Sequence, residues 1–151
     1  MNEPTPAQGV TVTQVPSATG IDDQALLQIG AVAQLVDLSL RTVRHYEDAG
    51  LVRPAARTAG GFRLYDNDTV ARLQLIKQMK PLGFTLEEMR LLLETRERLD
   101  DPSLDPDERN NLHERIALFS AAATEKVRGL RDQLATAEEF ASTLQDDTLE
   151  A

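Results

Sequence analysis

The stretch Ser39-Leu-Arg-Thr-Val-Arg-His-Tyr-Glu-Asp-Ala-Gly-Leu51 decides the fold of this chain. Ser39 can accept hydrogen bonds from the exposed backbone N–H groups at the start of a helix, and Gly50 supplies the left-handed residue that ends one. The side of this helix that turns inward is expected to carry Leu40, Val43 and Ala49. Its outer surface carries hydrogen-bond donors and planar rings, from Arg41, Thr42, Arg44, His45 and Tyr46. Such a face suits a DNA groove, and it is equally compatible with plain solvation.

A second helical pattern precedes this stretch. Its apolar residues fall on one face of a helix, at Ile29, Val32, Ala33 and Val36. Asp37-Leu38 then interrupts the period, and Asp tolerates the left-handed backbone that a tight turn needs. Two short helices joined in this way predict a helix-turn-helix, whose second helix enters the major groove of DNA.

A small β-hairpin is predicted after the second helix. The residues before Pro54 leave the helix in extended form, because proline disfavours helical angles in the residue before it. Gly60-Gly61 is a hairpin turn signal, and the run Phe62–Tyr65 alternates like a strand. A hairpin in this place is a wing that can hold phosphates beside the groove, through Arg57, Arg63 and Tyr65. The alternative is a surface hairpin whose aromatic residues pack the core, and we expect Phe62 or Leu64 to pack there.

Two supporting helices follow the wing. Asp66 starts the first, whose buried side is expected to carry Val70, Leu73, Leu75, Ile76 and Met79. Pro81-Leu-Gly83 stops it, and Thr85-Leu-Glu-Glu88 forms a capping box for the next helix. That helix carries Leu86, Met89, Leu92 and Leu93 and is expected to end near Asp100. Methionine and leucine at this spacing indicate a core and not a cofactor site.

A long final helix is predicted after a polar, proline-broken linker. Nine apolar positions recur at a mean spacing of 3.5 residues, which is the period of a coiled coil: Ile116, Phe119, Ala123, Val127, Leu130, Leu134, Ala137, Ala141 and Leu144. Leu112 extends this series backwards. A helix of this length has no core of its own, so we expect it to pair with the same helix of a second subunit. The alternative is that it folds back on its own domain.

Charge and composition bound the function. The net charge of −9 argues against nucleic acid at first, but residues 29–65 hold five arginines against three acidic side chains. Local charge decides phosphate contact, so the total does not exclude DNA. The absence of cysteine excludes disulfides and thiolate sites, and two histidines make a metal site unexpected. No membrane span or secretory signal is recognised, so we expect a cytoplasmic protein with no membrane partner and no cofactor.

The order of these elements resembles the MerR family of bacterial transcription regulators. The matching residues are Ile29-Gly-Ala-Val-Ala, Ser39-x-Arg-Thr-x-Arg44-x-Tyr46-Glu-x-x-Gly50-Leu51, Pro54, Gly61-Phe-Arg63-x-Tyr65, Leu73, Ile76 and Leu82-Gly-Phe-Thr-Leu-Glu-Glu88. The resemblance covers about residues 29–96, and its many fixed spacings make it specific. Two residues depart from the family pattern: His45 stands where the family usually has tyrosine or phenylalanine, and Gly60 replaces a common asparagine.

The resemblance implies a homodimer with antiparallel C-terminal helices, bound to a pseudo-palindromic promoter on double-stranded DNA. Members of this family bend and untwist an overlong promoter spacer so that RNA polymerase engages both elements, which makes the polymerase an indirect partner. The DNA contacts carry over as Arg41, Thr42, Arg44, His45 and Tyr46 in the helix, with Arg63 and Tyr65 in the wing. The family's effector chemistry does not carry over, because its sensing cysteines and large ligand domain have no counterpart here. The effector, if one exists, is therefore unassigned.

The predicted fold class is mainly α, a winged helix-turn-helix domain with a hairpin wing and a long C-terminal dimerisation helix. The expected divisions are a disordered tail at 1–23, the DNA-binding domain at 24–100, a linker at 101–107, the dimerisation helix at 108–146 and a tail at 147–151. No nucleophile–base pair or phosphate-cradling loop points to an enzyme. The alternative function is a coiled-coil adaptor for other proteins, built on a winged-helix platform. Confinement of the arginine excess to residues 29–65 favours DNA.

Overall fold

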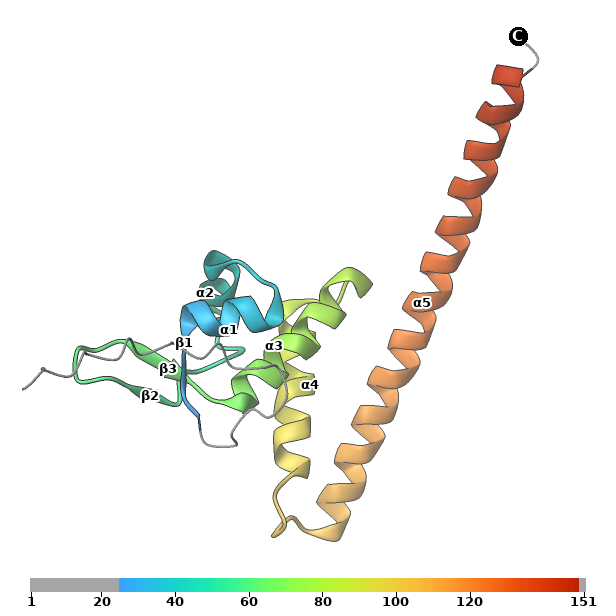
Figure 1. Ribbon diagram of the computed structural model, residues 1–151. Coiled ribbons are helices and arrows are strands. Elements are labelled where there is room, and N and C mark those ends of the chain that lie inside the picture. Colours follow the sequence, from blue (N-terminus) through green and yellow to red (C-terminus); the bar gives the residue numbers. More distant parts are fainter. Residues whose placement is uncertain (1–24, 150–151) are drawn as a thin grey trace, which may run out of the picture.

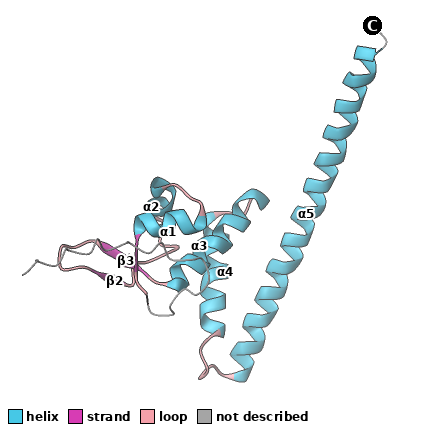
Figure 2. Ribbon diagram, viewed as in Figure 1, coloured by secondary structure: helices cyan, strands magenta, loops and turns pink. Residues whose placement is uncertain are grey.

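The computed structural model describes residues 25–149, and the expected disordered tail at 1–23 lies outside this range. A compact group of short helices and a small sheet is followed by one long helix that extends away from it (Figures 1 and 2). The predicted fold class, a winged helix-turn-helix with a long C-terminal helix, is confirmed. The elements in order are β1 (Leu27–Gln28), α1 (Ile29–Val36), α2 (Leu40–Asp48), β2 (Ala56–Arg57), β3 (Arg63–Tyr65), α3 (Asn67–Met79), the 3-10 turn η1 (Lys80–Leu82), α4 (Leu86–Leu99) and α5 (Pro106–Leu149).

Local signals set the ends of the helix-turn-helix. Asp37 adopts the left-handed conformation with φ 53°, and Gly50 does so with φ 76° after α2. The Ser39 hydroxyl accepts the backbone N–H of Thr42 at 3.0 Å. These expectations are confirmed, but the inward face of α2 differs from the prediction. Leu40 is exposed, because the short helix instead buries its residues three apart, Val43 and Tyr46.

The wing is one part of a three-stranded antiparallel sheet in which β3 lies between β1 and β2. The Thr58 N–H donates to the Phe62 carbonyl at 2.8 Å, closing the predicted hairpin. The expectation that Phe62 or Leu64 packs the core is wrong, since Phe62 is 68% exposed and Leu64 is half-buried. Side chains alternate between the two faces of a strand, and the register of β3 gives the core position to Tyr65, which is fully buried.

Helices α3 and α4 complete a single core beneath the helix-turn-helix. Both start at the predicted caps: Asp66 accepts the Thr69 N–H, and Thr85 and Glu88 form the capping box. The buried cluster joins all these elements, through Val32, Ala33, Val36, Val43, Tyr46, Leu51, Val52, Tyr65, Val70, Leu73, Ile76, Met79, Phe84, Met89 and Leu93. Each buried aliphatic side chain contributes about 1.5–3 kcal/mol, so this core fixes how α2 is presented.

Replacing Thr85 with alanine tests the capping box. The Thr85 hydroxyl accepts the Glu88 N–H at 3.2 Å, and the Glu88 carboxylate accepts the Thr85 N–H at 2.8 Å. Thr85→Ala is expected to lower the free energy of unfolding by about 1 kcal/mol, measured by urea denaturation. Thr136→Ala, on the exposed middle of α5, serves as the control. An equal loss in both variants would contradict the assignment.

Helix α5 has two parts with different surroundings. Its first turns pack on the chain's own domain, where Leu112 is buried and the ring of Phe119 lies 6.3 Å from that of Phe84. Leu112, Ile116, Phe119 and Ala123, predicted to pair with a second subunit, are therefore half-buried or buried within this chain. From Val127 onwards the apolar stripe is exposed, and Figure 1 shows this end of α5 extending clear of the domain. The helix begins at Pro106 and not at residue 108, and it continues to Leu149, past the predicted end at residue 146.

Candidate nucleic-acid interface

Exposed arginine and histidine side chains lie on the outer face of α2. Arg41, Arg44 and His45 are exposed, as the sequence predicted. Thr42 is half-exposed, and its hydroxyl lies 2.8 Å from that of Ser39 at the helix start. Because Val43 and Tyr46 anchor the opposite side of the helix in the core, this face is held rigidly. The arrangement offers fork-shaped guanidinium donors of the kind that contact guanine edges or phosphates.

A hollow between α2 and the wing gathers further arginines. We call it the cationic groove, and it is lined by Gln28, Ile29, Arg44, Arg57, Gly61, Phe62, Arg63 and Tyr65. Arg57 is steadied at its rim by a bond from Nη1 to the Gly61 carbonyl at 3.2 Å. The structure thus brings together one arginine of α2 and two of the wing, which are far apart in sequence. Three guanidinium groups around one hollow suit a phosphate backbone.

Two predicted contact residues are buried instead of exposed, although Tyr65 also lines the cationic groove. Tyr46 is 2% exposed and Tyr65 is fully buried, so both rings belong to the core. The Tyr65 hydroxyl donates to Oε2 of Glu47, and Oε1 of Glu47 pairs with Arg63 Nε at 3.0 Å. Sequence reasoning gave Glu47 no role, because its partners lie across the fold in β3. The available signal was the fixed place of Glu47 directly after Tyr46 in the stretch of residues 39–51.

Burial and Glu47 both act on the Tyr65 phenol. Desolvation is the larger cause, and the hydrogen bond to Glu47 and the charge of Glu47 add to it; together they raise the pKa of Tyr65 to about 12. The positive charges of Arg63 and Arg44 oppose this rise. Tyr65 is therefore protonated, and donates, over the whole physiological range.

An alkaline titration tests this environment. The chain has two tyrosines and no tryptophan, so in a Tyr46→Phe background Tyr65 is the only phenol. Its tyrosinate absorbance should rise with a midpoint at about 12, against the ordinary 10.0. The folded state binds this proton more tightly than the unfolded state, so the stabilisation is complete below pH 10 and lost as pH rises to about 12. The same chain in urea is the control, and a midpoint near 10 in the folded chain would contradict the buried, bonded phenol.

Cations from α3 and α4 brace the helix-turn-helix from behind. Lys77 Nζ donates to the carbonyl of Val36, at the end of α1, at 3.0 Å. Arg90 Nη2 donates to the Ala49 carbonyl, at the end of α2, at 2.5 Å. Both bonds satisfy carbonyls that a helix leaves without partners and place positive charge at its negative end. The supporting helices therefore fix the ends of the helices that carry the candidate contacts.

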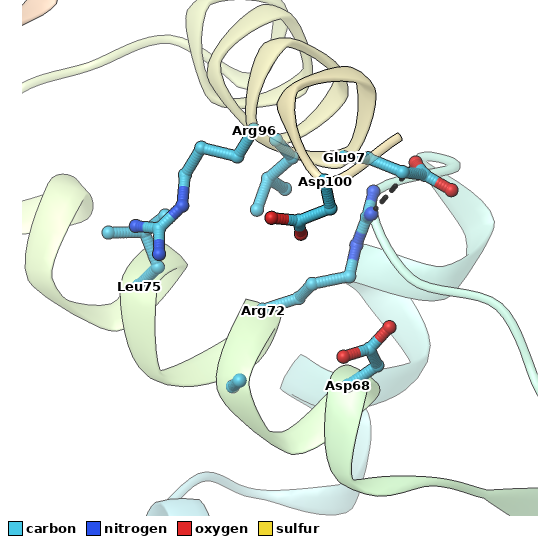
Figure 3. A pocket seen from close by; sticks show the side chains of 8 residues that line it. Asp68, Arg72, Leu75, Arg96, Glu97 and Asp100 are labelled. Carbon is cyan, nitrogen blue, oxygen red and sulfur yellow. Dashed lines mark hydrogen bonds and ion pairs between the residues drawn. The ribbon is translucent and has the colours of Figure 1, made fainter. Parts of the chain in front are cut away.

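A second hollow, between α3 and α4, has mixed charge (Figure 3). Arg72 crosses it, donating from Nε to the Leu51 carbonyl at 3.1 Å and pairing with Glu97 at 3.2 Å. Figure 3 shows the carboxylates of Asp68 and Asp100 beside it and Arg96 reaching over Leu75. With both signs of charge alternating around it, this hollow has no preference for phosphate, and Arg72 serves to tie the two layers together.

Within residues 25–149, no group of three or more histidine, aspartate or glutamate side chains is placed to hold a metal ion. In the same range, none of the helices has the length and apolar character needed to cross a membrane.

Two family models match the chain. Residues 27–96 match the model described as MerR HTH family regulatory protein. Residues 70–146 match the model described as MerR, DNA binding, and so include most of α5. Together the two models span the helix-turn-helix, the wing, the supporting helices and most of the long helix.

Curated relatives and solved structures agree with these matches. The chain is 39% identical over 105 residues to nodulation protein NolA of Bradyrhizobium elkanii, covering 70% of this chain and 45% of that protein. It is 32% identical over 119 residues to heavy metal-dependent transcription regulator 1 of Rhizobium meliloti, covering 78% and 72%. The N-terminal part of MtaN, the multidrug transporter activator of Bacillus subtilis, superposes with a TM-score of 0.50 at 30% identity, covering 83% of this chain and 99% of that one. The chain spans less than half the length of the NolA relatives.

Proposed function

The chain belongs to the MerR family of helix-turn-helix regulatory proteins, and from this premise we propose that it binds double-stranded promoter DNA as a homodimer and regulates transcription. The family and the curated relatives are transcription regulators and not enzymes. The observation that carries the proposal is the cationic groove, where Arg44 of α2 meets Arg57 and Arg63 of the wing. A protein adaptor has no need of that convergence.

The contacts divide into two kinds in this proposal. Arg41, Arg44 and His45 are exposed along α2, with Thr42 at its start, and they are proposed to contact base edges in the major groove. Arg57 and Arg63 are proposed to hold phosphates on the flank. Tyr46 and Tyr65 are buried and so support these contacts from the core.

The exposed part of α5 supports the homodimer. Its apolar side chains from Val127 to Leu144 face solvent in the single chain, with Leu134 57% exposed. Exposed apolar stripes of this size mark interaction surfaces, and the same stripe on a second, antiparallel copy is the proposed partner. Two such chains would present two copies of α2 to a pseudo-palindromic site. Bending and untwisting of the spacer, with RNA polymerase engaged as a result, completes the proposed mechanism.

The test is a binding experiment with the whole chain. Fragments of the source genome that the purified protein retains should share a two-fold symmetric sequence. Mobility shifts on that sequence should weaken steeply as salt rises, because each neutralised phosphate releases counterions. Absent or salt-independent binding would refute the proposal, and capture of proteins without DNA would favour the adaptor.

A further inference from the structure

We propose that Glu47 is a positioning residue that fixes the wing against α2 in the orientation that DNA binding requires. The inference rests on the proposed function and adds a residue to it that need not touch DNA. It is carried by the way in which both carboxylate oxygens of Glu47 are used.

Glu47 links α2 to β3, two elements that are far apart in the sequence. From α2 its Oε2 accepts the Tyr65 hydroxyl and its Oε1 pairs with Arg63 Nε at 3.0 Å. The Glu47 side chain is only 12% exposed, so solvent screens this link weakly. Tyr65 and Arg63 both belong to β3, which pairs with β1 on one side and β2 on the other. A carboxylate that holds β3 therefore holds the whole sheet.

The link to Glu47 uses one nitrogen of the Arg63 guanidinium group and leaves the other two available for a DNA contact. An arginine carries five N–H donors in a planar fork. Glu47 takes only Nε, and within residues 25–149 no hydrogen-bond partner is found for the two terminal nitrogens of Arg63. The Arg63 side chain is 41% exposed and lines the cationic groove. In this proposal Glu47 orients the guanidinium group through Nε and leaves its two terminal nitrogens available to a phosphate in the cationic groove.

Charge alone makes the opposite prediction. A carboxylate beside a phosphate-binding groove repels DNA, so removing it should tighten binding if Glu47 is merely an acidic neighbour. If Glu47 positions the wing, removing its charge should weaken binding. The sign of the effect therefore separates the two roles.

The experiment compares Glu47→Gln with Asp48→Asn, an isosteric change of the same charge one residue along α2. Asp48 is exposed, and no ion pair is found for it in the described part of the chain. On the DNA site retained by the wild type, Glu47→Gln should weaken binding roughly three- to tenfold, and Asp48→Asn should leave it unchanged or tighter. Tyr65→Phe, which alters no charge at neutral pH, should weaken binding in the same direction. The double variant Glu47→Gln with Tyr65→Phe should lose less than the two single effects combined, because the residues act as one unit.

Two further readouts separate positioning from loss of folding. Glu47→Gln should reduce the slope of log affinity against log salt by about one for each subunit, since a phosphate contact of Arg63 is lost. In the Tyr46→Phe background, Glu47→Gln should also lower the pKa of the Tyr65 phenol below the value of about 12 expected with Glu47 in place. Circular dichroism at the assay temperature shows whether each variant is folded. If Glu47→Gln is unfolded, the binding of Tyr65→Phe tests the inference in its place.

The outcomes are distinct. The inference would be overturned if Glu47→Gln bound DNA as tightly as the wild type or more tightly. The same holds for Tyr65→Phe where that variant replaces Glu47→Gln in the test. The proposed function would stand in either case. Failure of the wild type to bind any DNA would overturn the proposed function, and the inference with it. Weakened binding with a reduced salt slope would establish Glu47 as a positioning residue.

Discussion

Replacing Leu130 and Leu134 together with aspartate is expected to convert the protein to a monomer and to abolish specific DNA binding at micromolar concentration. Both leucines lie on the exposed apolar stripe of α5. Each buried leucine contributes about 1.5–3 kcal/mol, so four of them in a dimer contribute roughly 6–12 kcal/mol. Sedimentation velocity measures the oligomeric state, and fluorescence anisotropy on a labelled site measures binding.

A charge-matched control is available on the same helix. Leu118 and Leu149 are 71% and 84% exposed and fall outside the predicted stripe. Their double replacement with aspartate adds the same charge and should leave the dimer intact. If both double variants dissociated alike, added negative charge would be the cause, and if neither did, the stripe would not be the dimer interface.

Replacing Arg44 with alanine is expected to have the second large effect. Arg44 is exposed on α2 and also lines the cationic groove, so it is placed to contact a base edge and the backbone beside it. A bidentate arginine–guanine contact contributes about 1–3 kcal/mol, and a homodimer loses it twice. Specific affinity should therefore fall by roughly 30-fold to 10⁴-fold, measured by anisotropy titration at fixed salt.

Arg44→Lys distinguishes base contact from charge. Lysine keeps the positive charge but lacks the planar fork. We expect the lysine variant to recover affinity for unrelated DNA while specific affinity stays low. Arg96→Ala, an exposed arginine on α4, is the control and should bind normally. Full recovery of specific binding by Arg44→Lys would assign Arg44 to a phosphate alone.

The ends of the elements could be predicted because local chemistry sets them. Ser39, Asp66 and Thr85 each cap a helix through a bond to a residue three positions along, so the signal lies within four residues of sequence. Gly50 and Asp37 are residue types that adopt a positive φ more readily than most, and both do so here. Propensity and spacing sufficed for these features because nothing distant competes with them.

The orientation of the aromatic residues could not be predicted in this way. Tyr46 and Tyr65 have a polar tip and a large apolar body, and a sequence pattern does not say which part faces the core. Burial in the three-dimensional fold decides it, and the Tyr65 hydroxyl then needs Glu47, eighteen positions earlier. Strand β1 was missed for the same reason. Its two residues form a strand only because they meet the free edge of β3.

Because α5 is one unbroken helix, it fixes the geometry between the winged domain and the dimer interface of the proposed dimer. Its first turns are attached to the winged domain and its later turns carry the stripe, within a single helix of 44 residues. Each residue between the two parts adds about 1.5 Å of length and about 100° of rotation. The number of residues between Phe119 and Leu130 therefore sets the distance between the two winged domains of the proposed dimer and their rotation relative to each other. In homologues, an insertion or deletion in that interval should preserve the relative rotation of the two winged domains only when it adds or removes whole helical turns.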